Sequence, residues 1–412
     1  MKLFFMHRYF TYIIVFLFLV ACHNNTPKEV RFTEQQIASL HLGDTKILVP
    51  EEKMATHLDL TPFLGKKEFD LGSMVEKVKL VTLETTEESL VDGILKIIIT
   101  DNYIYIFDRF KRGSIIIFTA EGKFVKRLSH GQGPGELQRL YDIDYNFDTE
   151  ELIAFQHSFF LFFDKEGNYL RQERLPINFY NFIAVDNGYI FKTIPKQGNT
   201  HLNEKENYAF LFTKTDFSLE SVAISQTKDI KALGAYYYIY KNDSLISLTG
   251  HFSDSIYKYD AKKDKLYTEF VLDYDKKLPK KYIYGDDSSV FERYSQNNDC
   301  YFNIGEYFET FSQNVFFLRN HYNGYQNIIF RDKRTGNMIG GAITSFNRSE
   351  IPFFGFPIAV AGDNFVSLYK PDTNDYAALK NSKYISEADK EKIKQFKDDD
   401  NPILLYFTLK EF

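Results

Sequence analysis

The fold is decided by YIYIFD (Tyr103–Asp108), SIIIF (Ser114–Phe118) and KFVKRL (Lys123–Leu128). All three runs contain β-branched and aromatic residues, which favour half-buried strands. Glu121-Gly122 separates the last two runs and is typical of a tight hairpin turn. The segment therefore predicts three consecutive antiparallel strands.

The same arrangement returns 45 residues later. FFLFF (Phe159–Phe163) is followed by Glu166-Gly167 and Tyr169-Leu170-Arg171, and Gly122 to Gly167 spans 45 residues, as Phe118 to Phe163 does. The aromatic residue that precedes each such turn recurs at Phe118, Phe163, Phe212, Tyr259, Phe330 and Phe407. The steps between these six markers are 45, 49, 47, 71 and 77 residues. Six markers predict six similar sheet units.

A period of about 45 residues with four strands per unit is typical of propeller blades, whereas a solenoid would show helices or a leucine ladder. We therefore predict an all-β, six-bladed β-propeller with four-stranded antiparallel blades. The two long steps indicate insertions at 276–300 and 371–401. The second insertion contains one short predicted helix, which starts at Ser386-Glu387-Ala388-Asp389 and continues over 390–397.

The last predicted blade lacks an outer strand, because the chain ends at Phe412 soon after Leu404–Leu409. Val78–Leu83, or the residues just before it, would supply that strand from the N-terminal side. Closing the ring in this way would remove the free sheet edges.

The first 21 residues are a predicted signal peptide, with Lys2 and Arg8 before an uncharged run from Tyr12 to Ala21. This run is too short for a transmembrane helix, which needs about twenty residues. Leu19-Val20-Ala21-Cys22 matches the bacterial lipobox and predicts lipidation of Cys22. The alternative is an ordinary cleavage site that precedes a cysteine. We expect residues 22–60 to be a lipidated tether with one short strand at 46–49, and residues 61–412 to form the propeller.

Composition supports a β protein and excludes some partners. The chain contains 41 Phe, 29 Tyr and no Trp, and its net charge is −6. Nucleic acid is therefore excluded as a partner, because binding phosphates needs a basic face. Cys300 is the only cysteine besides Cys22, so lipidation leaves no disulfide to form. The predicted partners are a membrane, reached through the lipid, and an unknown protein, small-molecule or glycan ligand.

Four motifs carry a family resemblance: Leu83-Glu84-Thr85-Thr86, Ile106-Phe107-Asp108-Arg109, Gly131-Gln132-Gly133-Pro134-Gly135-Glu136 and Asn401-Pro402-Ile403-Leu404-Leu405. With the lipobox and the repeat, the chain resembles six-bladed β-propeller lipoproteins of diderm, Bacteroidales-type bacteria. This group is uncharacterised and distantly similar to NHL-repeat propellers. The resemblance covers Val78 to Phe412 and implies a fold and an extracytoplasmic compartment, but no established activity.

The loop from His130 to Glu136 is the most distinctive in the chain. As a ligand loop, its glycines would let backbone amides approach a guest, with polar contacts from His130, Gly133, Glu136 and Arg139. The favoured alternative is a turn from the outer strand of one blade to the inner strand of the next. Asp108-Arg109 is a second candidate, which either lines a central pocket or forms a structural charge pair.

No motif predicts catalysis, a metal or a cofactor. The nine histidines are scattered, no Gly-x-Ser-x-Gly elbow is present, and Cys300 has no basic partner nearby in the sequence. We therefore favour a non-catalytic binding module. The alternative is a propeller hydrolase or lyase with an axial metal, which would be favoured by three or more carboxylates or histidines that converge at one end of the channel.

The residues after the lipobox predict which way the protein faces. His23-Asn24-Asn25-Thr26-Pro27 lacks the acidic run that resembles a surface-export signal in related bacteria. We therefore expect an outer-membrane anchor that faces the periplasm.

Overall fold

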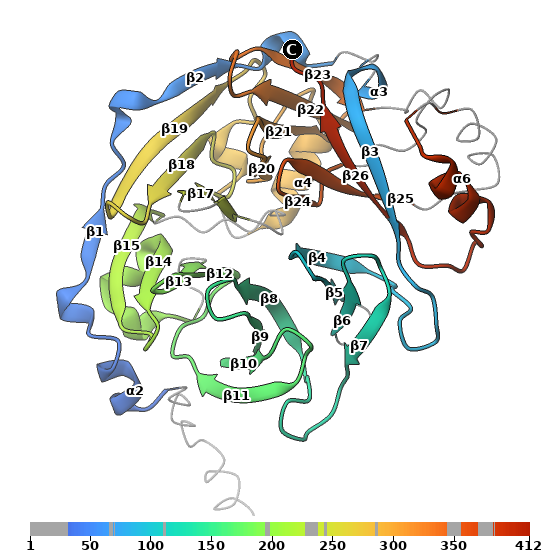
Figure 1. Cartoon of the computed structure of the whole chain (residues 1–412). Helices are drawn as coiled ribbons and strands as arrows, with labels where there is room; N and C mark the ends of the chain where they lie inside the picture. Colours follow the sequence, from blue (N-terminus) through green and yellow to red (C-terminus); the bar gives the residue numbers. More distant parts are fainter. Residues whose placement is uncertain are drawn as a thin grey trace, which may run out of the picture.

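The computed structural model describes residues 32–65, 69, 71–109, 113–193, 198–226, 238–242, 245–284, 287–343, 356–369, 382 and 384–412. Six antiparallel sheets stand in a ring around a central axis (Figure 1). The predicted six-bladed propeller is therefore confirmed. Within the described residues, no helix is both long enough and apolar enough to cross a membrane.

Each blade is one sheet whose strands run in order from the axis outward. Blade 1 contains β4 (Ile94–Ile99), β5 (Tyr103–Asp108), β6 (Ser114–Thr119) and β7 (Phe124–Leu128). Blade 2 contains β8 (Leu140–Asn146), β9 (Glu151–Gln156), β10 (Phe159–Phe163) and β11 (Tyr169–Arg174). Blade 3 contains β12 (Asn181–Val185), β13 (Gly188–Lys192), β14 (Tyr208–Lys214) and β15 (Leu219–Ser225). Blade 4 contains β16 (Ile239–Asn242), β17 (Leu245–Thr249), β18 (Ser255–Asp260) and β19 (Lys265–Asp273). Blade 5 contains β20 (Tyr307–Glu309), β21 (Gln313–Asn320), β22 (Tyr325–Asp332) and β23 (Met338–Ile343). Blade 6 contains β24 (Ala359–Ala361), β25 (Asn364–Tyr369), β26 (Ile403–Leu409) and β3 (Val75–Thr82).

The six aromatic markers all lie in the third strand of their blades, and all six are buried. A turn with a left-handed residue follows several of them, as at Gly122 (φ 87°). A Cβ built on Gly122 would lie 2.1 Å from the carbonyl oxygen of Thr82 in blade 6. Glycine is thus required here both by the backbone conformation and by the close approach of the neighbouring blade.

The ring is closed by the N-terminal strand β3. This strand pairs antiparallel with β26, and Leu80 lies opposite Leu405. Blade 6 therefore combines three C-terminal strands with one strand from the N-terminal region, as the sequence predicted (Figure 1). The pairing removes the free edge that β26 would otherwise expose.

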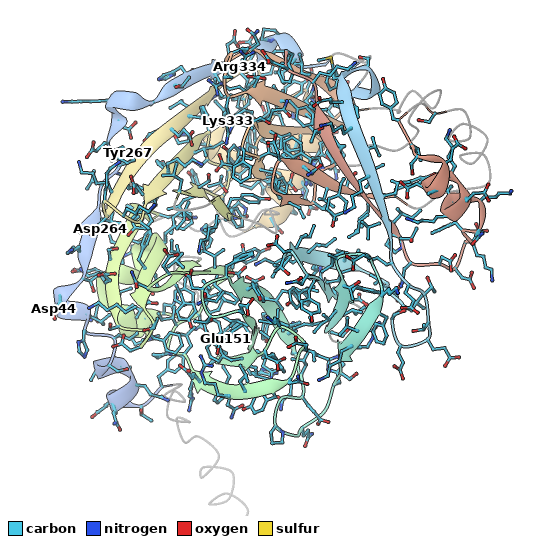
Figure 2. All side chains as sticks on the ribbon, in the orientation of Figure 1. Asp44, Glu151, Asp264, Tyr267, Lys333 and Arg334 are labelled. Carbon is cyan, nitrogen blue, oxygen red and sulfur yellow. The ribbon has the colours of Figure 1, made fainter. Side chains whose placement is uncertain are left out.

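Residues 32–60, which we call the strap, lie along the outside of blades 3 and 4 (Figure 1). The strap contains α2 (Glu34–Ala38), η1 (Leu42–Asp44), β1 (Lys46–Leu48), η2 (Glu52–Met54) and β2 (Thr56–Asp59). β1 pairs parallel with β15 and β2 pairs parallel with β19, so these two blades have five strands. Figure 2 shows Asp264 and Tyr267 on blade 4 beside the strap. Lys46 forms a 3.3 Å ion pair with Asp264, and Glu51 forms a β-bridge with Tyr267.

The sequence predicted β1 but not β2. Only Leu58 is buried within β2, so the strand shows no alternation of apolar and polar residues. The part of the predicted tether from Phe32 onward is therefore packed against the propeller. Leu40, Leu58 and Leu60 hold it there and are at most 4% exposed.

The remaining helices of the described residues lie before β3, between β13 and β14, and in the two insertions. They are η3 (Thr61–Phe63), α3 (Leu71–Met74), η5 (Thr200–Asn207), η6 (Lys280–Tyr282), α4 (Ser288–Asn297) and α6 (Glu387–Lys394). The predicted helix at Ser386 is confirmed, because the Ser386 side chain accepts a hydrogen bond from the amide of Asp389 at the start of α6. α4 was not predicted, although Asp287 caps its N-terminus and Phe291 anchors it in the core.

Candidate functional site

A pocket of about 730 Å³ lies on the axis of the ring. Residues of all six innermost strands (β4, β8, β12, β16, β20 and β24) line it. The lining runs from Lys96 and Asp144 to the hairpins between the first and second strands of the blades, such as Asp101 and Gly362. The pocket therefore opens at the face that carries these hairpins, which we call the hairpin face.

The walls of the pocket combine aliphatic side chains with charged and polar ones. The aliphatic residues are Ile97, Ile98, Ile99, Ile183, Ala184, Ile239, Ile358, Ala359, Val360 and Ala361. Concave sites of this size are typical of ligand pockets.

Two exposed aromatic side chains stand at the mouth. Phe147 follows β8 in blade 2 and is 55% exposed, and Phe311 follows β20 in blade 5 and is 65% exposed. Blades 2 and 5 lie three positions apart in a ring of six, so the two side chains come from opposite sides of the axis. Apolar side chains exposed beside a concave site are typical of binding surfaces.

Charged side chains at the mouth form ion pairs. Glu150 lies 2.8 Å from Lys165, and Asp186 lies 3.1 Å from Lys241. The hydrogen bond from Lys241 lowers the pKa of Asp186. Asp101 and Asp148 add two more carboxylates to the lining.

Lys96 and Asp144 line the floor of the pocket, and the buried Asp142 contacts Lys96 from outside the lining. Lys96 of β4 lies 3.2 Å from Asp142 and 3.8 Å from Asp144, both on β8. Asp142 also accepts a hydrogen bond from the amide of Phe182 at 3.0 Å, and Asp144 accepts one from Ala184 at 2.7 Å. The two carboxylates therefore bind the inner edge of blade 3 to blade 2, and together they leave the floor with one excess negative charge.

Burial is the main cause of the pKa shifts at the floor. It raises the pKa of Asp142, and it raises the pKa of Asp144 to about 6. Lys96 acts against burial in both cases, because its positive charge favours the ionised carboxylates. A single ammonium thus serves two carboxylates that both lie in a water-poor site.

A second buried charge cluster joins blades 4 and 5. Glu309 lines the pocket and is only 2% exposed. It bonds to Lys258 of blade 4, accepts a 2.7 Å hydrogen bond from Ser247 and lies 2.9 Å from Lys333. The two lysines lower the pKa of Glu309 against the effect of burial. The Glu309 carboxylate therefore links blade 4 to blade 5 through its contacts with the two lysines and Ser247 (Lys333 is labelled in Figure 2).

Within the part of the chain that the structure describes, no group of three or more His, Cys, Asp or Glu side chains is arranged to hold a metal ion. Cys300 is a buried thiol whose pKa burial raises to about 11, so it is a poor nucleophile at neutral pH.

Asp108 and Arg109 do not form a pair with each other in the described contacts. Asp108 is 2% exposed, accepts a hydrogen bond from the amide of Gly93 at 2.8 Å and lies 3.9 Å from Arg127. It borders a separate hollow of about 580 Å³ near β7. Arg109 is exposed, and its amide donates to the carbonyl of Gly93. Neither residue lines the axial pocket, and the neighbouring turn at 111–112 lies outside the described residues.

The loop from His130 to Glu136 connects β7 of blade 1 to β8 of blade 2. The Glu136 carboxylate accepts a 2.6 Å hydrogen bond from the amide of Gly133, and His130 contacts the carbonyl of Leu137. Arg139 packs over the ring of Tyr141, 5.3 Å from its centroid. The polar groups of this loop are thus largely used within the connection and its neighbours.

All six predicted ligand-binding residues lie at or near the opposite face of the ring, where each blade connects to the next. The sequence reasoning missed Lys96, Asp142 and Asp144. The alternation of Asp142 and Asp144 with Ile143 in the first strand of blade 2 was the available signal, because charged residues rarely lie inside a strand that faces the axis. Cys22 lies outside the described residues.

The geometry can be compared with known proteins. The family model of the domain of unknown function DUF4934 matches residues 56–408. The chain belongs to this family. DUF4934 membership and the six-bladed ring together confirm the resemblance to an uncharacterised propeller group. No curated protein matches the chain.

Among solved structures, a protein described as exported from Bacteroides fragilis is 18% identical, with a TM-score of 0.68 over 86% of this chain and 100% of that chain. At this identity the likeness shows the fold alone. BamB from Moraxella catarrhalis is 8% identical (TM-score 0.35, 82% of this chain, 91% of that chain). The extracellular domain of a one-component system from B. thetaiotaomicron is 13% identical (TM-score 0.33, 64% of this chain, 29% of that chain).

Proposed function

We propose that this DUF4934 protein is an exported lipoprotein, anchored through Cys22 in the outer membrane and facing the periplasm, whose propeller binds a ligand or partner protein without catalysis. The observation that carries the proposal is the axial pocket, which is lined by aliphatic and charged residues of all six blades and has two exposed phenylalanines at its mouth. Some charged residues near the pocket, such as Lys96 with Asp142 and Asp186 with Lys241, form ion pairs between blades, which suits a rigid binding site.

The proposed anchor would hold the propeller close to the membrane. Nine residues separate Cys22 from Phe32, and Phe32 is 2% exposed and packs against His201. Nine extended residues span roughly 30 Å at most. The strap then begins near α2, so the rim of blades 2 and 3 would be the part nearest the lipid.

The anchor and the binding site are tested together in the native cell envelope. We expect Cys22→Ala to move the protein from the membrane fraction to the soluble fraction, while the wild type stays with the membrane. Protease added to intact cells should leave the propeller uncut. Cys22→Ala protein that stays with the membrane, or digestion without lysis, would contradict the anchor or its orientation.

For the binding site, the lipidated protein is purified from the envelope and the bound material is identified. We expect a partner that accompanies the wild type to be lost from Phe147→Ala/Phe311→Ala. Tyr322→Ala is the matched control, because Tyr322 is 59% exposed in the β21–β22 turn, at the opposite end of blade 5 from Phe311. Equal recovery of the partner with the wild type and both variants would contradict the proposal that the hairpin face is the binding surface.

A further inference from the structure

The charges at the floor of the axial pocket do not balance. Asp142 is saturated, because it bonds to Lys96 and to the amides of Ile143 and Phe182. Asp144 accepts backbone hydrogen bonds from Ala184, at 2.7 Å, and from Tyr145, while Lys96 lies 3.8 Å from one of its oxygens, beyond hydrogen-bond distance. Its side chain keeps 14% of its surface exposed and lines the pocket. Asp144 thus offers the pocket a carboxylate to which, among the described contacts, no ammonium donates a hydrogen bond.

We propose that the axial pocket accepts an alkylammonium group, whose charge lies against Asp144 and whose methylene chain lies along the isoleucine walls. This assignment rests on the proposed binding function and adds the chemistry of the ligand. A positive group beside Asp144 would balance the two carboxylates that share Lys96, in a site where charge pairs are strengthened by the exclusion of water.

The dimensions and walls of the channel suit such a group. Asp144 and Phe147 are three residues apart along blade 2, or about 10 Å at the rise of a strand, which an extended chain of several methylenes can cover. The half-buried Ile99 would contact the methylenes, together with the small exposed parts of Ile183 and Ile239. An inorganic cation is a poorer match, because the described residues offer no cluster of three ligands.

The same chemistry can come from a free alkylamine or from a lysine side chain of a partner protein. Phe147 and Phe311 at the mouth would contact the backbone and neighbouring side chains of a polypeptide. A free alkylamine has no backbone or neighbouring side chains, so it would contact the phenylalanines at most with the end of its methylene chain. The two sources therefore differ in how much binding depends on the phenylalanines.

The test is titration calorimetry of the full mature chain in detergent with hexylammonium, 1-hexanol and a short peptide that carries one lysine. We expect saturable binding of hexylammonium, and binding of hexanol at least about tenfold weaker, since only the charged head can pair with Asp144. Asp144→Asn keeps an acceptor for the Ala184 amide and should weaken hexylammonium by at least about tenfold. Glu220→Gln, an exposed carboxylate of β15 outside the pocket, should change the affinity less than about twofold.

Ala361→Trp is a second variant, which narrows the channel without changing a charge and should also abolish binding. Loss of binding by the peptide, but not by hexylammonium, in Phe147→Ala/Phe311→Ala would identify a protein-borne lysine. Equal affinity of Asp144→Asn and wild type, tight binding of hexanol, or no binding of either amine would overturn the assignment. If the phenylalanines still governed partner recovery from the envelope in that case, the binding function would stand and only the ligand chemistry would fail.

Discussion

A chain that begins at Leu83 will not fold cooperatively, because β26 then has no outer partner. The lost strand β3 contributes Val75, Leu80 and Val81, each at most 3% exposed, and its full pairing with β26. Burial of each such side chain contributes about 1.5–3 kcal/mol, so the loss approaches the whole stability of an ordinary domain, about 5–15 kcal/mol. Calorimetry of the purified chain should show no sharp unfolding transition.

A chain that begins at Thr61 is the matched control. It lacks β1 and β2 but keeps β3, so the ring can still close. We expect it to unfold cooperatively at a lower temperature than the full chain, since the strap covers blades 3 and 4 only from outside. Identical midpoints for the chains that begin at Thr61 and Leu83 would show that β3 does not hold the ring together.

Lys96→Met should lower the free energy of unfolding by about 3–5 kcal/mol at pH 7.5, because it leaves two buried carboxylates without their common ammonium. The loss should be smaller at pH 4.5. The folded pKa of Asp144, about 6, lies above its ordinary value of 3.8. Between these values the folded state holds more protons than the unfolded state, so stability falls as pH rises. Without Lys96 the folded pKa values of Asp142 and Asp144 rise further, so the free energy of unfolding decreases more steeply with pH and over a range that extends to higher pH.

Urea unfolding at the two pH values measures the effect. Asp144→Asn in the Lys96→Met background should recover part of the loss at pH 7.5, because it removes one uncompensated charge. Lys262→Met, at the pocket mouth, should change stability by no more than about 0.5 kcal/mol. A Lys96→Met deficit of the same size at both pH values would contradict the charge balance described for the floor.

The fold could be predicted because the strand and turn pattern of each blade is formed by residues that are close together in the sequence. Phe118, Phe163 and their four counterparts mark the third strand of each blade. The turns that follow these markers have residues, such as Glu121-Gly122, that can be recognised in the sequence. The closing strand followed from the missing edge of the last blade. β2 could not be predicted, because its pairing is parallel, distant in sequence and mostly through backbone atoms.

The axial site was not predicted, because its residues are distant in the sequence. Lys96 and Asp142 are 46 residues apart and meet only when the inner strands of two blades lie side by side. Glycine-rich composition drew attention to the loop at Gly133, whose polar groups instead hold a connection between blades. The predictions for Cys22 stay predictions.

The axial pocket exists only if the ring closes in the described register, and a disulfide measures this directly. Lys77 and Thr408 are paired on β3 and β26 and are not buried. In a chain with Cys22 and Cys300 replaced by serine, Lys77→Cys/Thr408→Cys should oxidise rapidly and raise the unfolding temperature, as mass spectrometry and calorimetry would show. The out-of-register pair Lys79→Cys/Thr408→Cys should oxidise slowly; equal rates for the two pairs would contradict the closed propeller.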